Sequence, residues 1–371
     1  MTGPLTTLKV VEFAGLGPAP LAGQLLADLG AQVTVIDRAT SPAQPEDVNR
    51  RGKRSIALNL KSETGLAIAR AMIADADILI EGFRPGVMER LGLGPAACPD
   101  RLIYGRMTGW GQEGPLAHTA GHDITYLAQT GVLSLLATAD APPRPPLNLV
   151  ADYGGGTMFL VYGVMAAVIE RGVTGRGQVV DAAMIDGVPA MMGLIHTLMA
   201  QGQWRAPGAN WLDGAAPFFR CYRCSDGRDM AVGALEPQFY AQLLEGLGVG
   251  AGDVPPQMDE STWPRVCAQF AAIFASKPQS HWTQVFAGTD ACVAPVLTME
   301  EAAVDAHLAQ RGTYTVVDGV LQAGIAPRMS SMSGAPARAP TGPGAQANAI
   351  LAELGYEATA IAALRAAGDV T

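Results

Sequence analysis

LKVVEFAGLGPAPLAGQLLADLGAQVTVID, residues 8–37, decides the fold class of this 371-residue chain. Its apolar run at 8–13 predicts a buried strand, and the glycines within 15–17 predict a tight turn. Residues 21–29 then have helical periodicity, and a second apolar run follows at 33–36. A strand, a turn, a helix and a second strand form the first unit of a doubly wound α/β fold with a parallel sheet.

The alternation of strands and helices continues beyond this stretch. Apolar runs at 78–80 and 102–104 predict two more strands, and a helix is predicted at 65–76 before them. A segment rich in Gly, Pro and Asn at 201–217 predicts a linker. We therefore expect a large Rossmann-like domain over residues 1–200.

The pattern changes after the linker. Residues 218–233 alternate as a hairpin around a Ser-Asp-Gly turn, and helices are predicted at 238–247 and 263–274. This mixture predicts a smaller α+β domain over residues 218–325. A last amphipathic helix is expected at 349–366.

Charge and cysteine usage limit the class of protein. The net charge of −9 argues against a nucleic-acid partner, because phosphate binding needs a basic surface. Five cysteines and no signal-peptide pattern favour a reduced cytoplasmic enzyme, and the lone Cys-x-x-C at 221–224 lacks a second pair for a metal site. The longest apolar run, 158–169, is shorter than a membrane span of about 20 residues. We expect no metal, no membrane insertion and a cytoplasmic location.

The nicotinamide fingerprint is incomplete. Gly15 and Gly17 follow a predicted strand, and Asp37 ends the next one, as that fingerprint requires. Pro20 takes the place of the third glycine, however, and Pro18 lacks the backbone N–H that a phosphate would use. We therefore do not expect NAD binding.

Two segments supply candidate proton-transfer groups. His122 and Asp123 precede an apolar segment of near-helical spacing at 126–136, which places Asp123 in a capping position. Asp152 precedes three glycines and a predicted helix at 157–169. An imidazole and a separate carboxylate suit two-base chemistry, and a helix start can stabilise an oxyanion. The same residues also fit two helix caps and a buried histidine.

Several passages, in one order over most of the chain, resemble the α-methylacyl-CoA racemases, a branch of the family III CoA transferases. They include LKVVEFAGLGPAPLAGQLLADLGAQVTVIDR, LIEGFRPGVMERLGLGP, RLIYGRMTGWGQEGP, GHDITYLAQTGVLS, NLVADYGGGTMF, GALEPQFY and TDACVAPVLT. One such match is weak, whereas the ordered series is specific.

The resemblance implies an interlocked homodimer. Members of the family have a large domain formed by the N-terminal half and the C-terminal tail, here 1–200 completed by 326–371. The smaller domain, here 218–325, lies between these segments. Two chains thread through one another, so each active site is expected between the large domain of one subunit and the small domain of the other.

The resemblance also implies racemisation of 2-methylacyl-CoA thioesters at the α-carbon. We hypothesise that His122 acts on the S substrate and Asp152 on the R substrate, while the Asp123 backbone N–H holds the enolate oxygen. Glu236 is expected to hydrogen-bond the catalytic histidine across the dimer. CoA is part of the substrate, and no metal or redox cofactor is required.

CoA carries phosphates that pair with arginine or lysine. The candidates are basic residues of the N-terminal segments: Arg38, Arg51, Lys53, Arg54, Arg84 and Arg90. Arg38 and Arg84 are favoured, because a strand end and a turn expose ligand contacts. The run 51–54 fits a solvated surface equally well. Resemblance to the family adds Ala57 and Tyr126 as substrate contacts.

Two alternatives stay open at this point. A family III CoA transferase would use the aspartate at 152 as an acyl-carrying nucleophile and would not need His122. A catalytically inert CoA-binding protein would need none of the candidate proton-transfer groups. The sequence determines neither the acyl group nor the preferred direction.

Overall fold

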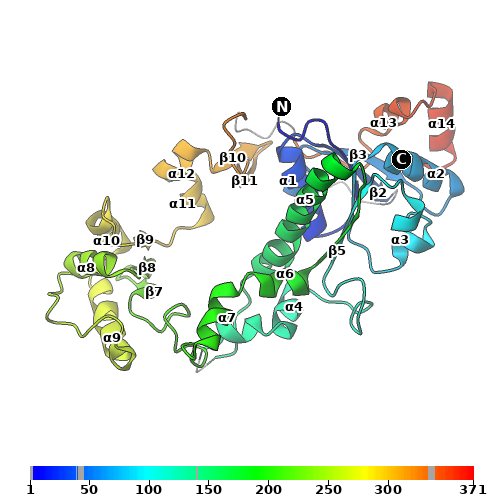
Figure 1. The fold of residues 1–371 in the computed structure, drawn as a ribbon. Coiled ribbons are helices and arrows are strands. Elements are labelled where there is room, and N and C mark those ends of the chain that lie inside the picture. Colours follow the sequence, from blue (N-terminus) through cyan, green and yellow to red (C-terminus); the bar gives the residue numbers. More distant parts are fainter. Residues whose placement is uncertain (1–2, 39, 41–45, 139–140, 333–338) are drawn as a thin grey trace. The chain divides into compact units, whose positions relative to one another are not determined.

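The computed structural model describes residues 3–38, 40, 46–138, 141–332 and 339–371. Their contacts divide the chain into two compact units (Figure 1). Unit 1 comprises Met1–Thr130, Pro146–Met191 and Ala306–Thr371, and unit 2 comprises Gly131–Pro145 and Met192–Asp305. Residues 333–338, within the expected C-terminal segment 326–371, lie outside the described residues.

A six-stranded sheet in the order β3-β2-β1-β4-β5-β6 forms the centre of unit 1. Its strands are β1 (Lys9–Phe13), β2 (Gln32–Arg38), β3 (Arg54–Leu58), β4 (Ile78–Glu81), β5 (Ile103–Thr108) and β6 (Val179–Ala183). Each neighbouring pair is parallel. The expected α/β fold with a parallel sheet is confirmed, and the strand order reverses between β1 and β4.

Helices cover both faces of this sheet (Figure 1). On one face, α2 (Glu63–Asp75), α13 (Ala347–Glu353) and α14 (Ala358–Ala366) share a buried apolar cluster with Val11 and Phe13 of β1. Glu12, between them in the strand, points to the opposite face, where a Cβ on Gly23 of α1 (Pro18–Asp28) would collide with it.

The remaining helical elements of unit 1 are short apart from α5, which packs on β5 and β6. They are 3-10 helices at Val48–Arg50 and Pro95–Ala97, α3 (Val87–Arg90), α4 (Asp123–Gln129), a π-helix at Leu149–Thr157, α5 (Met158–Thr174), α6 (Met184–Ala190) and α12 (Ala306–Arg311). A single helix expected at 349–366 is instead two, because Gly355 has a φ of 90° between α13 and α14.

The hairpin of β10 (Tyr314–Val317) and β11 (Val320–Ala323) groups with unit 1. The buried Arg51 guanidinium bonds Asp28 and also donates to Gln322 Oε1 at 3.0 Å. The sequence reading assigned all of 218–325 to the small domain. The contacts instead place 306–325 with the large unit, where hydrogen bonds from Arg51 to Gln322 and to the Ala323 carbonyl attach the hairpin.

Unit 2 has an antiparallel sheet of β7 (Phe219–Arg223), β8 (Asp229–Gly233) and β9 (Val293–Pro295). The predicted hairpin at 218–233 is therefore present. Helices accompany it: α7 (Gly193–Ala200), α8 (Pro237–Gly246), α9 (Trp263–Phe274), α10 (Gln279–Phe286) and α11 (Met299–Val304), with 3-10 helices at Val132–Leu136 and Glu260–Thr262. Its core is largely aromatic, and Tyr222 stacks on Phe274.

The π-helix and α5 together form a helical segment of 26 residues, Leu149–Thr174. By length and mean hydropathy this segment meets the requirement for crossing a membrane, with 28% of its most apolar window buried. The expectation of no such segment counted only 158–169, because the π-helical residues were read as a loop. Core helices of soluble proteins have the same length and mean hydropathy.

Candidate active site

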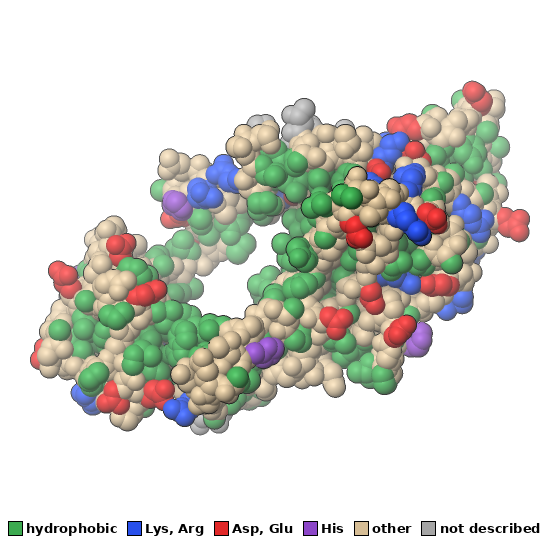
Figure 2. Space-filling view, in the orientation of Figure 1, with side chains coloured by type: hydrophobic (Ala, Val, Ile, Leu, Met, Phe, Trp, Pro, Cys, Tyr) green, Lys and Arg blue, Asp and Glu red, His purple; other side chains and the backbone are tan. Residues whose placement is uncertain are grey.

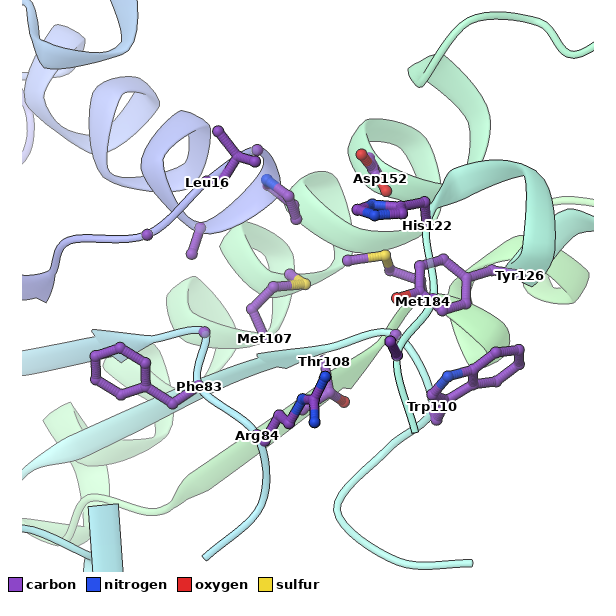
Figure 3. Close-up of a pocket in the computed structure, with 18 of the residues that line it drawn as sticks. Leu16, Phe83, Arg84, Met107, Thr108, Trp110, His122, Tyr126, Asp152 and Met184 are labelled. Atoms are coloured by element: carbon purple, nitrogen blue, oxygen red, sulfur yellow. The ribbon is translucent and has the colours of Figure 1, made fainter. Parts of the chain in front are cut away.

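A cavity of about 380 Å³ lies where the carboxyl ends of β1, β4 and β5 meet (Figure 3). It is lined by Gly15–Ala19, Gly82–Pro85, Met107–Trp110, Ala117, Thr119–His122, Tyr126, Asp152 and Met184. Open α/β sheets bind ligands at this edge, beside the point where the strand order reverses. Five stretches that are distant in sequence thereby converge on one site.

The glycine turn after β1 forms one wall of the cavity. Gly17 has a φ of 74°, and a Cβ at this position would lie 3.7 Å from Asp152 Oδ2. The carbonyl of Pro18, the first residue of α1, accepts a hydrogen bond from Thr157 Oγ1 at 2.8 Å. The turn thus packs against the segment that carries Asp152, which brings a carboxylate close to the glycine turn.

His122 is the N-cap residue of α4, and its side chain is exposed to the cavity. Its backbone N–H donates to Thr125 Oγ1 at 2.9 Å, which helps to hold the start of the helix. Figure 3 shows the His122 ring beside the Asp152 carboxylate. The sequence pattern predicts Asp123 as the capping residue of α4, whereas Asp123 is the first residue within the helix.

The Asp123 carboxylate is buried and turned away from its own helix. Its Oδ2 accepts the backbone N–H of Ala151 at 2.8 Å and that of Asp152 at 2.9 Å. Its Oδ1 is buried and has no hydrogen-bond partner among the described residues. Asp123 therefore caps the π-helix at 149–157 and not α4.

Asp152 lies in the first turn of that π-helix and not in a loop. Burial raises the pKa of its carboxyl, and the nearby Asp123 charge raises this pKa further. A hydrogen bond from the Asn148 side chain lowers the pKa of Asp152, and so does the electrostatic effect of His122. A carboxyl with a raised pKa beside an imidazole is suited to take and return a proton.

Tyr126 and Trp110 close another side of the cavity. The two rings meet edge to face with centroids 4.8 Å apart, and a Cβ on Gly109 would collide with the Tyr126 ring. Burial, followed by the Asp152 charge, raises the pKa of Tyr126 to about 12, so its hydroxyl stays protonated at neutral pH. The predicted substrate contact at Tyr126 thus lies in the same cavity as both candidate bases.

Comparison with known proteins identifies this architecture. The model of CoA-transferase family III matches residues 5–348. The chain belongs to this family. The expected resemblance is confirmed by two relatives, each called alpha-methylacyl-CoA racemase. The one from Mus musculus is 47% identical over 319 residues, 85% of this chain and 83% of the relative. The one from Homo sapiens is 45% identical over 316 residues, 84% of this chain and 82% of the relative.

Solved structures support the same fold. A CAIB/BAIF family protein from Brucella suis aligns with a TM-score of 0.80 at 25% identity, covering 95% of this chain and all (100%) of that one. The family III fold therefore extends over nearly the whole chain.

The basic residues expected to hold CoA in this family III protein fall into two groups. Arg84 lines the cavity, and Arg38 is exposed at the carboxyl end of β2 on the same edge of the sheet. Arg90, in α3, is also exposed. Arg54 lies at the amino end of β3, where its guanidinium makes two 2.9 Å bonds to Glu353. The structure does not bring Arg54 to the cavity.

Two further candidates are enclosed. Ala57 is buried, and its carbonyl accepts the N–H of Thr371 at 3.2 Å. Lys53, read as part of a possible surface run, is also buried: its Nζ bonds Glu12 Oε2 and the Pro20 carbonyl, each at 2.7 Å. Burial lowers the pKa of Lys53 and raises that of Glu12. Lys53 therefore forms a buried ion pair with Glu12 beneath α1 and does not act as a phosphate ligand.

Glu236 lies in unit 2, at the N-cap of α8. It is not among the residues that line the cavity, and all of those residues belong to unit 1. A bond between this carboxylate and His122 remains a prediction.

Sequence reasoning missed a buried arginine network beneath the cavity. Arg106 of β5 donates to Glu81 Oε1 at 2.9 Å and to Glu89 Oε1 at 2.8 Å. Glu81 Oε2 also accepts the Phe83 N–H at 2.7 Å, which fixes the turn that presents Arg84. Charged residues inside otherwise apolar strands, Glu81 and Arg106, were the available signal.

Proposed function

We propose that this protein racemises 2-methylacyl-CoA thioesters at the α-carbon. The observation that carries the proposal is that His122 and Asp152, from separate segments, line one cavity. Relatives that are 45–47% identical and bear the name alpha-methylacyl-CoA racemase support it. The α-proton of a thioester is weakly acidic, and inversion needs a base on each face of the carbon.

The two groups would exchange roles between the directions. His122 removes the α-proton of the S substrate, and the C–H electron pair moves onto the thioester oxygen to form an enolate. Protonated Asp152 then donates its proton to the opposite face, and the R thioester results. In the reverse direction Asp152 is the base and the His122 imidazolium is the acid. One proton is taken and one returned in each turnover.

The enolate oxygen would be held at the start of α4. The first N–H groups of a helix lack partners within the helix, and Asp123 is the first residue of α4. A donor of this type typically contributes about 10²–10³ in rate. We assign this role to the Asp123 backbone N–H.

CoA would enter as part of the substrate. The phosphates of CoA would bind guanidinium groups. Arg84 lines the cavity, Arg38 is exposed at the carboxyl end of β2, and Arg90 is exposed after the carboxyl end of β4. Among the described residues no cluster of three His, Cys, Asp or Glu side chains is arranged to hold a metal ion. That no metal or redox cofactor is needed, and that the enzyme is cytoplasmic, remain predictions.

A homodimer would complete the site. Along α5 several apolar side chains face outward: Tyr162 is 73% exposed, Ile169 72% and Val173 88%. Exposed apolar faces of this kind mark interaction surfaces. We propose that an interlocked second chain covers them and that Glu236 of the partner subunit hydrogen-bonds His122.

Mixed dimers with His122→Ala on one chain and Glu236→Ala on the other should recover activity, because one of their two sites is intact. A fully active monomer in sedimentation would contradict this arrangement.

The test of the reaction is isotopic. In deuterated water, without an acceptor acid, a single 2-methylacyl-CoA enantiomer should lose optical purity while its α-carbon takes up deuterium. Wild-type protein that neither exchanges nor racemises a range of 2-methylacyl-CoA chain types would refute the proposal.

Transfer of CoA between acids is the second candidate, because the matching family model is that of the CoA transferases. In this reaction Asp152 would attack the thioester, form a mixed anhydride and release CoA thiolate. The signature would be a hydroxylamine-trappable Asp152 adduct and turnover only when a second carboxylic acid is present.

A further inference from the structure

We propose that the Asp123 side chain is a positioning group that ties the backbone at Asp152 to the helix that carries His122. Its backbone follows His122 directly, while its carboxylate holds the N–H groups of Ala151 and Asp152. One residue would thereby set the separation of the two bases. The kinetic part of this inference rests on the proposed racemase function, whereas its structural part does not.

The π-helix explains why such a tether is needed. In a π-helix each N–H bonds the carbonyl five residues earlier, so the N–H groups of its first residues have no partner within the helix. Ala151 and Asp152 lie in the first turn of the π-helix at 149–157. Asp123 Oδ2 accepts both N–H groups, and hydrogen bonds to a charged acceptor are stronger than neutral ones.

The far end of the π-helix is attached to a different part of the cavity. Thr157 is fully buried, and its hydroxyl donates to the Pro18 carbonyl. Gly155 packs so closely on Gly187 of α6 that a Cβ at 187 would collide with the Gly155 carbonyl. Contacts with the β1–α1 turn and α6 thus fix residues 155–157, whereas Asp123 holds the backbone N–H groups at the end that carries Asp152.

The orphaned oxygen of Asp123 is consistent with this role. A buried carboxylate oxygen without a partner is unfavourable, and the two N–H groups that the other oxygen accepts offset this cost. A displacement of about 1 Å between reacting groups can reduce the rate on the order of 100-fold.

The experiment compares Asp123→Ala with Asp123→Asn. The alanine variant removes the acceptor, so amide hydrogen exchange in a peptide spanning 149–157 should accelerate. The asparagine oxygen can still accept both N–H groups, so the protection should be largely restored. If Asp123→Ala does not fold, Asp123→Ser replaces it, because a serine hydroxyl is too short to span the same gap.

A kinetic measurement on the same variants tests the coupling of the two bases. In Asp123→Ala, racemisation should fall on the order of 100-fold, and more than deuterium uptake on one face, because exchange needs one base and inversion needs both. Asp123→Asn should recover part of the loss. The matched control is Thr125→Val, which removes the acceptor of the His122 N–H and should leave protection at 149–157 unchanged.

The outcomes separate the two proposals. Unchanged protection at 149–157 in Asp123→Ala, or equal losses of exchange and racemisation, would overturn the positioning role. If protection changes as expected but the wild-type protein does not racemise, the tether stands and the racemase function fails.

Discussion

The two edges of the same parallel sheet differ in the pairing of one arginine each, Arg54 at the amino edge and Arg84 at the carboxyl edge. At the amino edge, Lys9 pairs with Asp75 and Arg54 with Glu353, and Figure 2 shows basic and acidic side chains intermixed over β3, α2 and α13. At the carboxyl edge, Arg84 lines a cavity and has no ion pair among the described residues. Charges neutralised by one another stabilise a surface, whereas charges left open can bind an anion or move a proton.

The largest effect should follow from removal of a base at the carboxyl edge. His122→Ala and Asp152→Asn should each abolish measurable racemisation, because a general acid–base group contributes about 10²–10⁴ in rate and inversion needs two. Each variant should retain some α-deuterium exchange on the face whose base survives, measured by mass spectrometry. If either variant racemised the substrate as fast as the wild type, the residue changed in it would not be a catalytic base, and the carboxyl edge would lose its proposed role.

Disruption of the Lys53–Glu12 ion pair, which lies beneath α1 between the two edges, should have the next largest effect, and this effect is on stability. Lys53→Met leaves the buried Glu12 without its partner, at a cost of about 3–5 kcal/mol in the free energy of unfolding. The double variant Glu12→Gln/Lys53→Met should recover much of this loss in denaturant titrations. A small effect of Lys53→Met would mean that Glu12 finds water or another partner.

Substrate binding should then distinguish the two edges directly. Arg84→Ala should raise the KM for acyl-CoA more than it lowers kcat, by the loss of one or two charge-assisted hydrogen bonds of roughly 1.5–3 kcal/mol each. Arg54→Ala is the control: it should leave KM unchanged and lower stability by less than about 1 kcal/mol. Calorimetric titration with CoA checks both. A loss of affinity only in Arg54→Ala would reverse the assignment.

The smallest effect concerns Asp152 and pH. Because the pKa of folded Asp152 is raised, the folded protein keeps a proton that the unfolded chain has released between the ordinary and the raised pKa. Stability therefore falls as pH rises through this window. Asp152→Asn should have a slightly higher Tm than the wild type at neutral pH, and the difference should vanish below about pH 4. A lower Tm at neutral pH would show that the Asp152 charge is stabilising.

Local patterns predicted much of this molecule. The runs at 8–13 and 33–36 became β1 and β2, and 263–274 became α9, because periodicity and turn residues act over short distances. The motif around His122 lines the cavity at the carboxyl edge, and its catalytic role stays a prediction. Strands β3 and β6 were missed, and the π-helix was read as a loop, because three glycines imitate a turn and their packing on α6 does not show in the sequence.

The sequence by itself determined the alternating α/β fold, the family, and the candidate bases at His122 and Asp152. Only the tertiary structure decided how the charges pair. Lys53 bonds a carboxylate 41 positions away, Arg54 one 299 positions away, and Asp123 caps a helix whose bonded N–H groups lie 28 and 29 positions further on. The physical reason is range: hydrophobic periodicity acts between neighbours in the chain, whereas an ion pair or a cap depends on which segments packing brings together.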